Sequence, residues 1–245
     1  MLFRSDVFVE IDVGQGRCGV APAAAGALAH QVVSHGLRFA GLQAYHGRAQ
    51  HLRSAAEREA AIRHAVALVR AAQASVTSAG IACPLVTGAG TGSFVFEAAS
   101  AVYGELQAGS YLFMDADYAA NAPAPHAPRF EHALFVKSQV MSRGASHAVI
   151  DAGHKSHAID SGPPRVWSPS GGSVPEFDNG GDEHGILLAR EAAAALPELG
   201  ATVWLVPGHC DPTVNLHTHF VGVRGGLMAG MVACIWSIDA RGCVF

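Results

Sequence analysis

The first half of the chain alternates short apolar runs, rich in β-branched residues, with longer alanine-rich stretches. Strands are predicted at 7–13, 39–45 and 85–87, and helices at 23–34 and 54–78. Strands and helices that alternate at this spacing, with glycine-rich turns between them, are typical of βα units with a parallel sheet. A closed barrel needs more such units than the chain supplies. The predicted fold class is therefore α/β, with part of a (β/α) barrel.

The pattern changes after Tyr118. A connector rich in proline and alanine at 119–128 predicts a domain boundary, which divides the chain into 1–120 and 121–245. Further short strands, separated by glycine turns, are predicted at 133–140, 147–151, 201–206, 220–223 and 232–238. A single helical turn is expected at 191–196. This half is expected to be a small β domain or barrel.

Composition excludes several classes of partner. The 245 residues carry a net charge of −4 and no basic stripe, so we expect no nucleic-acid partner. The longest weakly polar run, 225–236, is too short and too rich in glycine to span a membrane. The five cysteines are scattered, and the N-terminus lacks a signal-peptide pattern. Both features predict a cytoplasmic protein with reduced thiols.

The segment Val206–Leu216, VPGHCDPTVNL, places an imidazole, a thiol and a carboxylate in one turn between two prolines. If this turn is extended, His209 and Asp211 point the same way while Cys210 faces elsewhere. An imidazole and a carboxylate make a half-site for a divalent metal such as zinc or manganese. The alternative is a loop in which the two side chains only hydrogen-bond each other.

Two further stretches follow predicted strands. GAGTG, at 88–92, can form an anion nest in which backbone N–H groups and the Thr91 hydroxyl hold a phosphate, although a glycine turn without a ligand remains an alternative. Arg17 follows the first strand, and Tyr45, His46 and His51 follow the second. Barrel enzymes place their chemistry at these strand ends. A surface arginine is the alternative for Arg17 and is the less favoured one between three glycines, whereas any one of the fourteen histidines is more often structural than catalytic.

These stretches together resemble a known family. VEIDVGQGRCGV, GLQAYHGRAQH, TGAGTGS, ELQAGSYLFMDADY, DAGHKSHAIDSGPP, GDEHG and VPGHCDPTVNLH occur in the order seen in D-threonine aldolases and D-3-hydroxyaspartate aldolases. More distantly, they resemble eukaryotic-type D-serine dehydratases. The resemblance covers nearly the whole chain. It implies a pyridoxal 5′-phosphate (PLP) binding barrel of the alanine racemase type, a following β domain, and a homodimer.

The resemblance also implies a set of residues that contact PLP. The matching positions are Arg17, Tyr45, Gly90, Thr91, Gly92, Gln107, Gly109, Ser110 and Tyr111. The arginine matches a contact to the phenolic oxygen, and the first tyrosine lies beside the cofactor. The residues of the glycine turn match the phosphate cradle. The last four match positions that line the pyridine nitrogen and the second side of the phosphate.

The remaining matches are His209 and Asp211, as ligands of Mn, Mg or Zn, and His51, as the general base. The implied reaction is a retro-aldol cleavage of a D-3-hydroxy amino acid, D-threonine or D-3-hydroxyaspartate, to glycine and an aldehyde. The metal would lower the pKa of the β-hydroxyl, and His51 would remove its proton directly or through water. A D-serine dehydratase-like ammonia lyase would use the same metal to help hydroxide leave, and the sequence does not decide between the two.

One expected part does not match. The family's Schiff-base lysine belongs to a segment upstream of the strand that begins at Val7, whereas the two lysines here, Lys137 and Lys155, follow the connector. We therefore expect a chain without the PLP lysine. It could be a fragment or mis-started product of an intact PLP lyase, or a truncated remnant with little or no activity. It could also be a non-PLP protein, such as a metal-dependent hydrolase or binding module, that keeps the metal site.

Overall fold

The computed structural model describes residues 5–190 and 194–242. The chain divides into two compact units, which are described separately. The first contains residues up to Tyr111 together with 120–129, and the second contains 112–119 and the residues from Phe130 onward. The connector at 119–128 therefore belongs almost entirely to the first unit.

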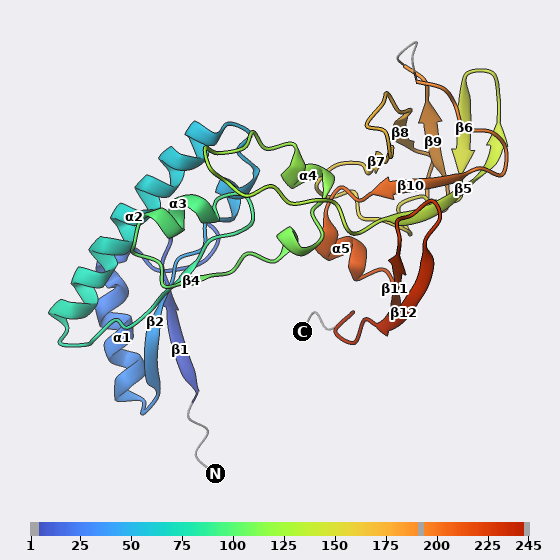
Figure 1. Ribbon diagram of the computed structural model, residues 1–245. Coiled ribbons are helices and arrows are strands. Elements are labelled where there is room, and N and C mark those ends of the chain that lie inside the picture. The colour runs from blue at the N-terminus through green and yellow to red at the C-terminus, as the bar shows by residue number, and fades with distance from the viewer. Residues whose placement is uncertain (1–4, 191–193, 243–245) are drawn as a thin grey trace. The chain divides into compact units, whose positions relative to one another are not determined.

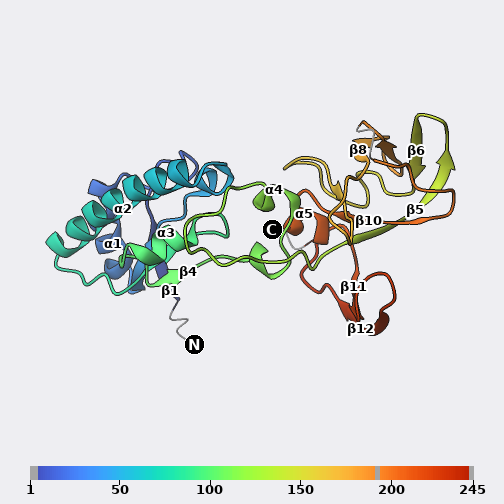
Figure 2. The ribbon, with the colours of Figure 1, turned by 45° about the horizontal axis from the view of Figure 1, so that its top comes forward.

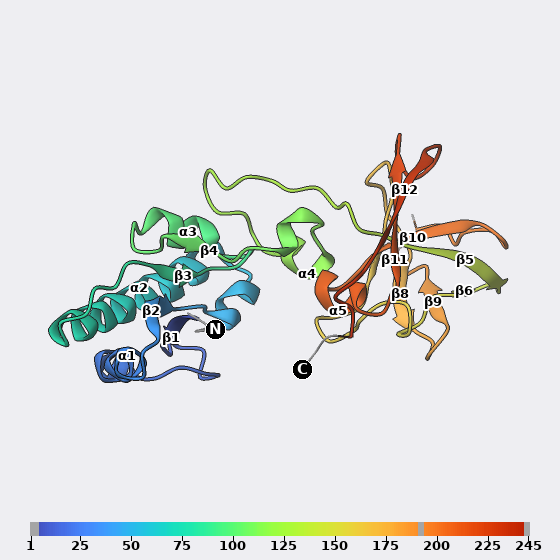
Figure 3. The same ribbon diagram turned by 90° about the horizontal axis from the view of Figure 1, so that it is seen from below.

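The first unit is built on a four-stranded sheet in the order β1-β2-β3-β4, which can be followed in Figure 3. Its strands are β1 (Asp6–Glu10), β2 (Arg38–Gln43), β3 (Val86–Gly88) and β4 (Glu105–Leu106). Each neighbouring pair is parallel. The parallel sheet predicted from the alternation of strands and helices is confirmed, and β4 is a strand that the apolar pattern did not reveal.

Helices connect these strands. They are α1 (Ala25–Ser34), α2 (Ala55–Ser78) and α3 (Phe94–Ala99), with the short 3-10 turns η1 (Pro22–Ala24) and η2 (Gly47–His51). A third 3-10 turn, η3 (Ser110–Leu112), follows β4. The first two helices lie side by side (Figure 1), and their buried faces pack with the strands around Leu42, Ile62 and Val69. Both were predicted from the sequence within two residues of their observed bounds.

Local sequence explains where α2 begins and ends. Ser54 precedes it, and its hydroxyl accepts a hydrogen bond from the Glu57 backbone N–H at 3.5 Å, as in a capping box. After Ser78 the chain reaches Gly80 at φ +75°, and the Ile81 N–H bonds back to the Val76 carbonyl. A glycine accepts this left-handed conformation at little cost, which stops the helix there.

The second unit contains a six-stranded antiparallel sheet in the order β7-β10-β5-β6-β9-β8. The strands are β5 (Val136–Arg143), β6 (His147–Ile150), β7 (Arg165–Val166), β8 (Glu176–Asn179), β9 (Gly185–Leu188) and β10 (Thr202–Val206). The two edge strands, β7 and β8, contact each other, so the sheet curls toward a barrel. Its core includes Ile150, Leu187 and Leu205.

Two short helices and a hairpin complete the second unit. The helices are α4 (Ala116–Ala119) and α5 (Cys210–Val214). The hairpin pairs β11 (His219–Arg224) with β12 (Met231–Ser237) and projects from the six-stranded sheet (Figure 2). The β character expected for this half is confirmed. The helical turn expected at 191–196 lies partly at 191–193, outside the described residues, and 194–196 form no helix.

The close approach of α1 to α2 depends on two small residues. A side chain at Gly26 would place its Cβ 2.3 Å from the Ser75 carbonyl oxygen, so only glycine fits there. The Ser75 hydroxyl accepts from the Gly26 N–H at 3.1 Å and donates to the Ala23 carbonyl at 2.9 Å. One serine thus closes two backbone bonds at the start of α1.

We predict that Ser75→Ala lowers the free energy of unfolding by about 1 to 2 kcal/mol, because two backbone groups of α1 lose their partner. Chemical denaturation followed by circular dichroism measures this change. Ser78→Ala is the matched control, since Ser78 is exposed in the last turn of the same helix. Equal losses in the two variants would contradict the role given to Ser75.

Candidate functional site

The cofactor residues expected from the sequence, together with His51, lie on loops that leave one edge of the first unit's sheet. In a parallel sheet the segments that follow the strands all emerge at the carboxyl edge. The segment after β1 carries Arg17, and the segment after β2 carries Tyr45 and His51. The segments after β3 and β4 carry the glycine turn and 107–111. The topology therefore places all of these positions at one edge.

Arg17 and Tyr45 contact each other at this edge. The Arg17 guanidinium carbon lies 5.6 Å from the centroid of the Tyr45 ring, within the range of a cation–π contact. A guanidinium nitrogen is 3.9 Å from a Glu10 carboxylate oxygen. Burial raises the pKa of the Tyr45 phenol, and the Arg17 charge opposes that shift. The phenol is therefore a neutral donor beside a cation.

A hydrogen bond joins the loops that follow β3 and β4. The Tyr111 N–H donates to the Thr91 hydroxyl oxygen at 3.1 Å. A Cβ added at Gly109 would meet nothing within 4 Å, so the backbone there faces open space. The structure thus brings Thr91 together with 109–111, the two stretches that the resemblance assigned to opposite sides of a phosphate.

Gln107 belongs to a polar network across three strands. Its side-chain amide nitrogen donates to the Gln43 side-chain oxygen and to the Thr87 hydroxyl, both at 2.9 Å. The Thr87 hydroxyl in turn donates to a Glu105 carboxylate oxygen at 2.5 Å. Sequence reasoning did not select Gln43, Thr87 or Glu105. Their signal was a polar residue at or beside the end of each short strand.

The Gln50 side chain holds the glycine turn through two hydrogen bonds. Its side-chain oxygen accepts from the Gly92 N–H at 3.0 Å, and its side-chain nitrogen donates to the Ser93 hydroxyl at 2.7 Å. A Cβ at Gly90 or Gly92 would lie 2.5 Å or 2.4 Å from an oxygen of Gln50. Packing against Gln50 therefore requires both glycines. Ala89, between them and β3, has φ +67°, which is uncommon for a residue with a side chain.

Glu97 lies behind the same turn and is 1% exposed. The Ser93 hydroxyl donates to one of its carboxylate oxygens at 2.8 Å. Burial raises the pKa of Glu97 to about 7, and the hydrogen bond from Ser93 only partly opposes this. Glu97 was missed because an acid within an apolar stretch gave no sign of its burial.

The two histidines after β2 differ in their surroundings. His51 is exposed at the end of η2, directly after Gln50. His46 is buried, and its Nδ1 accepts a hydrogen bond from the Ala49 N–H at 3.4 Å. Burial lowers the pKa of His46. His51 therefore lies at the surface of this segment, whereas His46 lies in its interior.

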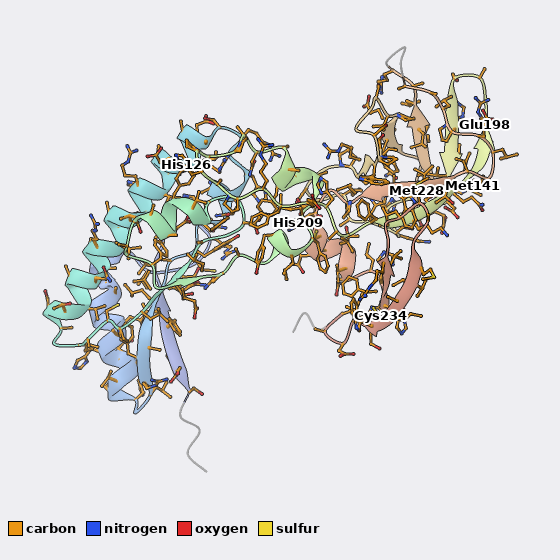
Figure 4. The ribbon with its side chains drawn as sticks, viewed as in Figure 1. His126, Met141, Glu198, His209, Met228 and Cys234 are labelled. Carbon is orange, nitrogen blue, oxygen red and sulfur yellow. The ribbon has the colours of Figure 1, made fainter. Side chains whose placement is uncertain are left out.

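In the second unit, Asp115 fixes the orientation of His209. The Asp115 side chain is fully buried, and one of its oxygens lies 2.8 Å from His209 Nδ1. The same oxygen accepts from the Cys210 N–H at 3.1 Å, and the other accepts from the Tyr118 N–H at 2.8 Å. Since a carboxylate accepts, Nδ1 carries the proton and Nε2 presents a lone pair. His209 lies where α5 begins (Figure 4).

The extended turn expected around His209 and Asp211 is wrong. His209 has extended backbone angles, but α5 begins at the next residue and contains Asp211 in its first turn. Pro212 is compatible with this turn because the first helical N–H groups need no internal partner. His209 therefore pairs with Asp115, and Asp211 remains an exposed carboxylate.

Carboxylates surround His209 nonetheless. The hydrogen bond that His209 donates to Asp115 raises the pKa of His209, and the charges of Asp160 and Asp211 add to the shift. Cys210 is buried, with its thiol 3.5 Å from the Met114 carbonyl, and burial raises the pKa of that thiol to about 12. Over residues 5–190 and 194–242, no three histidine, cysteine or acidic side chains gather as a complete metal site. His209 and Asp211 thus offer at most a half-site.

Both lysines belong to the second unit. The Lys155 ammonium binds Glu183 at 2.6 Å and Asp182 at 3.1 Å, and these ion pairs raise its pKa. His154 also contacts Asp182, at 2.9 Å. The GDEHG turn therefore holds Lys155 as a cation. Lys137 lies over the Trp204 ring, with its ammonium 6.0 Å from the centroid.

Comparison with known proteins agrees with this arrangement. Residues 4–117 match the family model of the alanine racemase N-terminal domain, and residues 133–223 match that of the putative serine dehydratase domain. No helix in the described part of the chain is long and apolar enough to cross a membrane. The chain thus has an alanine racemase-like fold, with a partial α/β barrel followed by a small β domain. This confirms the predicted fold class.

Individual proteins of known name are similar to this chain over nearly its whole length. A D-threonine aldolase from Arthrobacter sp. is 49% identical over 97% of this chain and 61% of its own length. A 3-hydroxy-D-aspartate aldolase from Paracoccus denitrificans (strain Pd 1222) is 40% identical over 96% of this chain and 60% of its own length. The crystal structure of D-threonine aldolase from Filomicrobium marinum superposes with a TM-score of 0.90, at 49% identity, covering 98% of this chain and 63% of that one.

The chain is therefore a close homologue of proteins named D-threonine aldolase and 3-hydroxy-D-aspartate aldolase, the resemblance that the sequence motifs predicted. It spans about three fifths of the length of the curated relatives that it matches.

Glu97 gives a prediction about stability against pH. Its pKa is about 7 in the folded chain, against 4.5 for an ordinary glutamate, so the folded chain binds more protons in this interval. The stabilisation is complete below about pH 4.5 and is lost as pH rises through about 7, for a total on the order of 3 kcal/mol. Denaturation of the wild type and of Glu97→Gln across this range measures it. The advantage of the wild type should shrink as pH rises, and a constant difference would contradict the assignment.

Proposed function

We propose that this chain forms part of a PLP- and divalent-metal-dependent carbon–carbon lyase. It would cleave D-3-hydroxy amino acids, D-threonine or D-3-hydroxyaspartate, to glycine and an aldehyde. The support is the similarity of the chain to aldolases of these names and the two groups of side chains described above. Because the chain spans about three fifths of its relatives, the proposal concerns the whole protein of which these residues provide the described part.

The residues at the carboxyl edge of the first unit fit PLP in three respects. Arg17 supplies a cation beside the half-buried phenol of Tyr45, which suits an anionic ring oxygen. Thr91 and 109–111 are joined by a hydrogen bond, and the backbone at Gly109 faces open space that a phosphate could fill. Gln107 lies at the same edge, at the position that the resemblance assigns to the pyridine nitrogen, and its side-chain amide is held in place by bonds to Gln43 and Thr87.

We assign the phosphate to Gly90, Thr91 and Gly92, with Gly109, Ser110 and Tyr111 on its other side. The Gly92 N–H already donates to Gln50, so the Thr91 hydroxyl and the loop at 109–111 are expected to contribute more of the binding. When bound, PLP supplies an electron sink for the pair of electrons left on the substrate Cα.

His209 and Asp211 are the proposed metal ligands. Asp115 occupies His209 Nδ1, which leaves Nε2 as the ligand atom, and an oriented imidazole of this kind is the usual donor to a metal. Cys210 points its thiol at the Met114 carbonyl instead, so the available donors are nitrogen and oxygen. These donors suit Mn, Mg or Zn. A metal held here would polarise the substrate β-hydroxyl and lower its pKa.

His51 is the proposed base. It would take the proton from the β-hydroxyl oxygen, directly or through one water, as the Cα–Cβ bond breaks. Its exposure leaves the imidazole accessible to a substrate, while the neighbouring Gln50 is fixed in the protein interior. We also propose a homodimer in the cytoplasm, which agrees with the free cysteines at 18, 83, 210 and 234.

The hydrogen bond between Asp115 and His209 is the observation that carries the proposal. Exchange of an α-proton, the reaction that gives the alanine racemase fold its name, needs no metal at a β-hydroxyl. Cleavage of a Cα–Cβ bond next to a hydroxyl gains directly from one, because the alkoxide must form. A histidine with its tautomer set by a buried carboxylate is therefore the feature that favours an aldolase within this fold.

The direct test is to incubate the whole protein that contains this chain with PLP, Mn²⁺ and D-threonine and to measure glycine and acetaldehyde. Formation of both from D-threonine, and not from L-threonine, is the expected result, and it should be lost in His209→Ala. The match to a serine dehydratase domain favours a second candidate, an ammonia lyase. Release of ammonia and an oxo acid would identify that reaction instead. Absence of all these products would reject both.

We predict that Asp115→Asn weakens Mn²⁺ binding by about 10- to 100-fold, because the amide no longer holds the His209 N–H. Calorimetric titration with Mn²⁺ measures the affinity, and circular dichroism verifies that the variant is folded. Asp239→Asn is the matched control, since Asp239 is an exposed aspartate of the same unit. Unchanged Mn²⁺ affinity in a folded Asp115→Asn variant would contradict the assigned role.

A further inference from the structure

A continuous series of hydrogen bonds runs from the glycine turn into the interior of the first unit. The Gly92 N–H donates to the Gln50 oxygen at 3.0 Å, and the Gln50 amide donates to the Ser93 hydroxyl at 2.7 Å. Ser93 then donates to Glu97 at 2.8 Å. Gln50, Ser93 and Glu97 are each 0% or 1% exposed. The turn is thus connected to a carboxyl group that solvent does not reach.

This series of hydrogen bonds ends at Glu97, whose carboxyl group is only partly hydrogen-bonded. One Glu97 oxygen receives the Ser93 hydroxyl, and the other has no hydrogen-bond partner in the described part of the chain. A buried carboxylate normally needs several donors or a cation, and a single hydroxyl falls short of this. The arrangement therefore favours a protonated carboxyl.

The groups around Glu97 do not supply the missing charge. The titratable groups that feel its charge are Tyr45, after β2, and Tyr103, before β4, and both are phenols whose pKa values are raised. The buried cation of α2 is Arg58, which donates to the carbonyls of Leu52, Arg53 and Ala122. Ionisation of Glu97 would therefore add an uncompensated negative charge behind the turn.

The Gly90–Gly92 turn is held in place against Gln50. Gln50 is bonded on three sides, since its amide also donates to the His46 carbonyl at 3.1 Å and its own carbonyl accepts from the Asn121 side chain at 2.8 Å. Gly90 and Gly92 pack against Gln50 more closely than any Cβ would allow. A change at Ser93 or Glu97 must therefore reach the backbone that the phosphate would contact.

We propose that Glu97 is a positioning residue for anion binding. Through Ser93 and Gln50 it sets the conformation of the Gly90–Gly92 turn, and its protonated form lets that turn accept a divalent phosphate group. This inference rests on the proposed PLP site. It adds that phosphate affinity depends on a proton held on a buried carboxyl, which touches neither the phosphate nor the substrate.

The physical reason is repulsion between like charges. A protonated Glu97 is neutral, so it does not reduce the positive potential of the turn N–H groups and of Arg17. An ionised Glu97 places a negative charge on the interior side of the same turn, in a region that water screens poorly. Anion affinity should therefore be highest on the acid side of neutrality and should fall as the carboxyl loses its proton.

The test uses sulfate as the probe, because sulfate remains divalent across the range in which phosphate changes its own charge. Binding to the full chain is followed by amide NMR at Gly90, Thr91 and Gly92, from about pH 5.5 to about pH 8.5. We expect wild-type affinity to fall by about tenfold over this range, the effect of one buried charge near a divalent anion. In Glu97→Gln, which keeps an acceptor for Ser93 without an ionisable proton, the affinity should keep its low-pH value.

A matched control separates Glu97 from other titrating groups. Glu59→Gln makes the same chemical change on the exposed side of α2 and should behave as wild type. His46 and His51, close to Gln50 in sequence, are present in all three proteins, so the difference between the pH curves reports on Glu97. Sulfate binding with the same pH dependence in wild type and Glu97→Gln would overturn this inference alone. No binding to the turn at any pH would overturn both it and the proposed PLP site.

The Ser93→Ala variant tests, without any ligand, whether the effect of Glu97 on Gly92 passes through Ser93. The Gly92 amide resonance of the free wild-type chain should shift with pH as Glu97 titrates, and this shift should vanish in Glu97→Gln. In Ser93→Ala the carboxyl remains but the hydrogen-bonded connection is cut, so the response at Gly92 should also be lost. A Gly92 response that persists in Ser93→Ala would overturn the route through Ser93.

Discussion

Parallel pairing of β1 to β4 is the constraint on which the first unit depends. Because all four strands run the same way, the segments that follow them meet at one edge, and residues as distant in sequence as Arg17 and Gln107 share it. The same pairing brings polar side chains near the strand ends close to one another. Gln43, Thr87 and Gln107 are hydrogen-bonded across the sheet. The site is therefore a consequence of the sheet's direction, and loop sequences only refine it.

Each unit contains a buried acid beside its candidate site, and their surroundings differ. Asp115 lies against the ring N–H of His209 and two backbone N–H groups. Glu97 receives a single hydroxyl. The first arrangement holds a neighbouring side chain in one orientation, whereas the second leaves a proton on the acid itself. A buried carboxyl group thus orients a neighbouring side chain in the second unit and carries a proton in the first, according to the number of donors around it.

The sequence was most informative where local chemistry decides the structure. The helix predicted at 54–78 matches α2 almost to the residue, and Ser54 caps its start. Strands β1, β2 and β3 overlap the apolar runs that predicted them. It was least informative where partners are distant, as for Asp115 and His209. The turn at Asp211 was treated as extended, although Pro212 is suited to the first turn of a helix and α5 begins at Cys210. The strand β8 was missed because its outward-facing residues are polar.

The segment 120–129 has a consequence for dissecting the protein into its parts. Asn121 bonds the Gln50 carbonyl, the Ala122 N–H bonds the Arg53 carbonyl, and Arg58 bonds the Ala122 carbonyl. A stretch whose proline and alanine content suggests a free tether is instead a strap across the segment that follows β2. An N-terminal half expressed only as far as Tyr118 would lose residues 120–129. The Gln50 carbonyl would then be without the hydrogen bond from Asn121. A cut after Arg129 would preserve it, so the useful boundary lies beyond the connector.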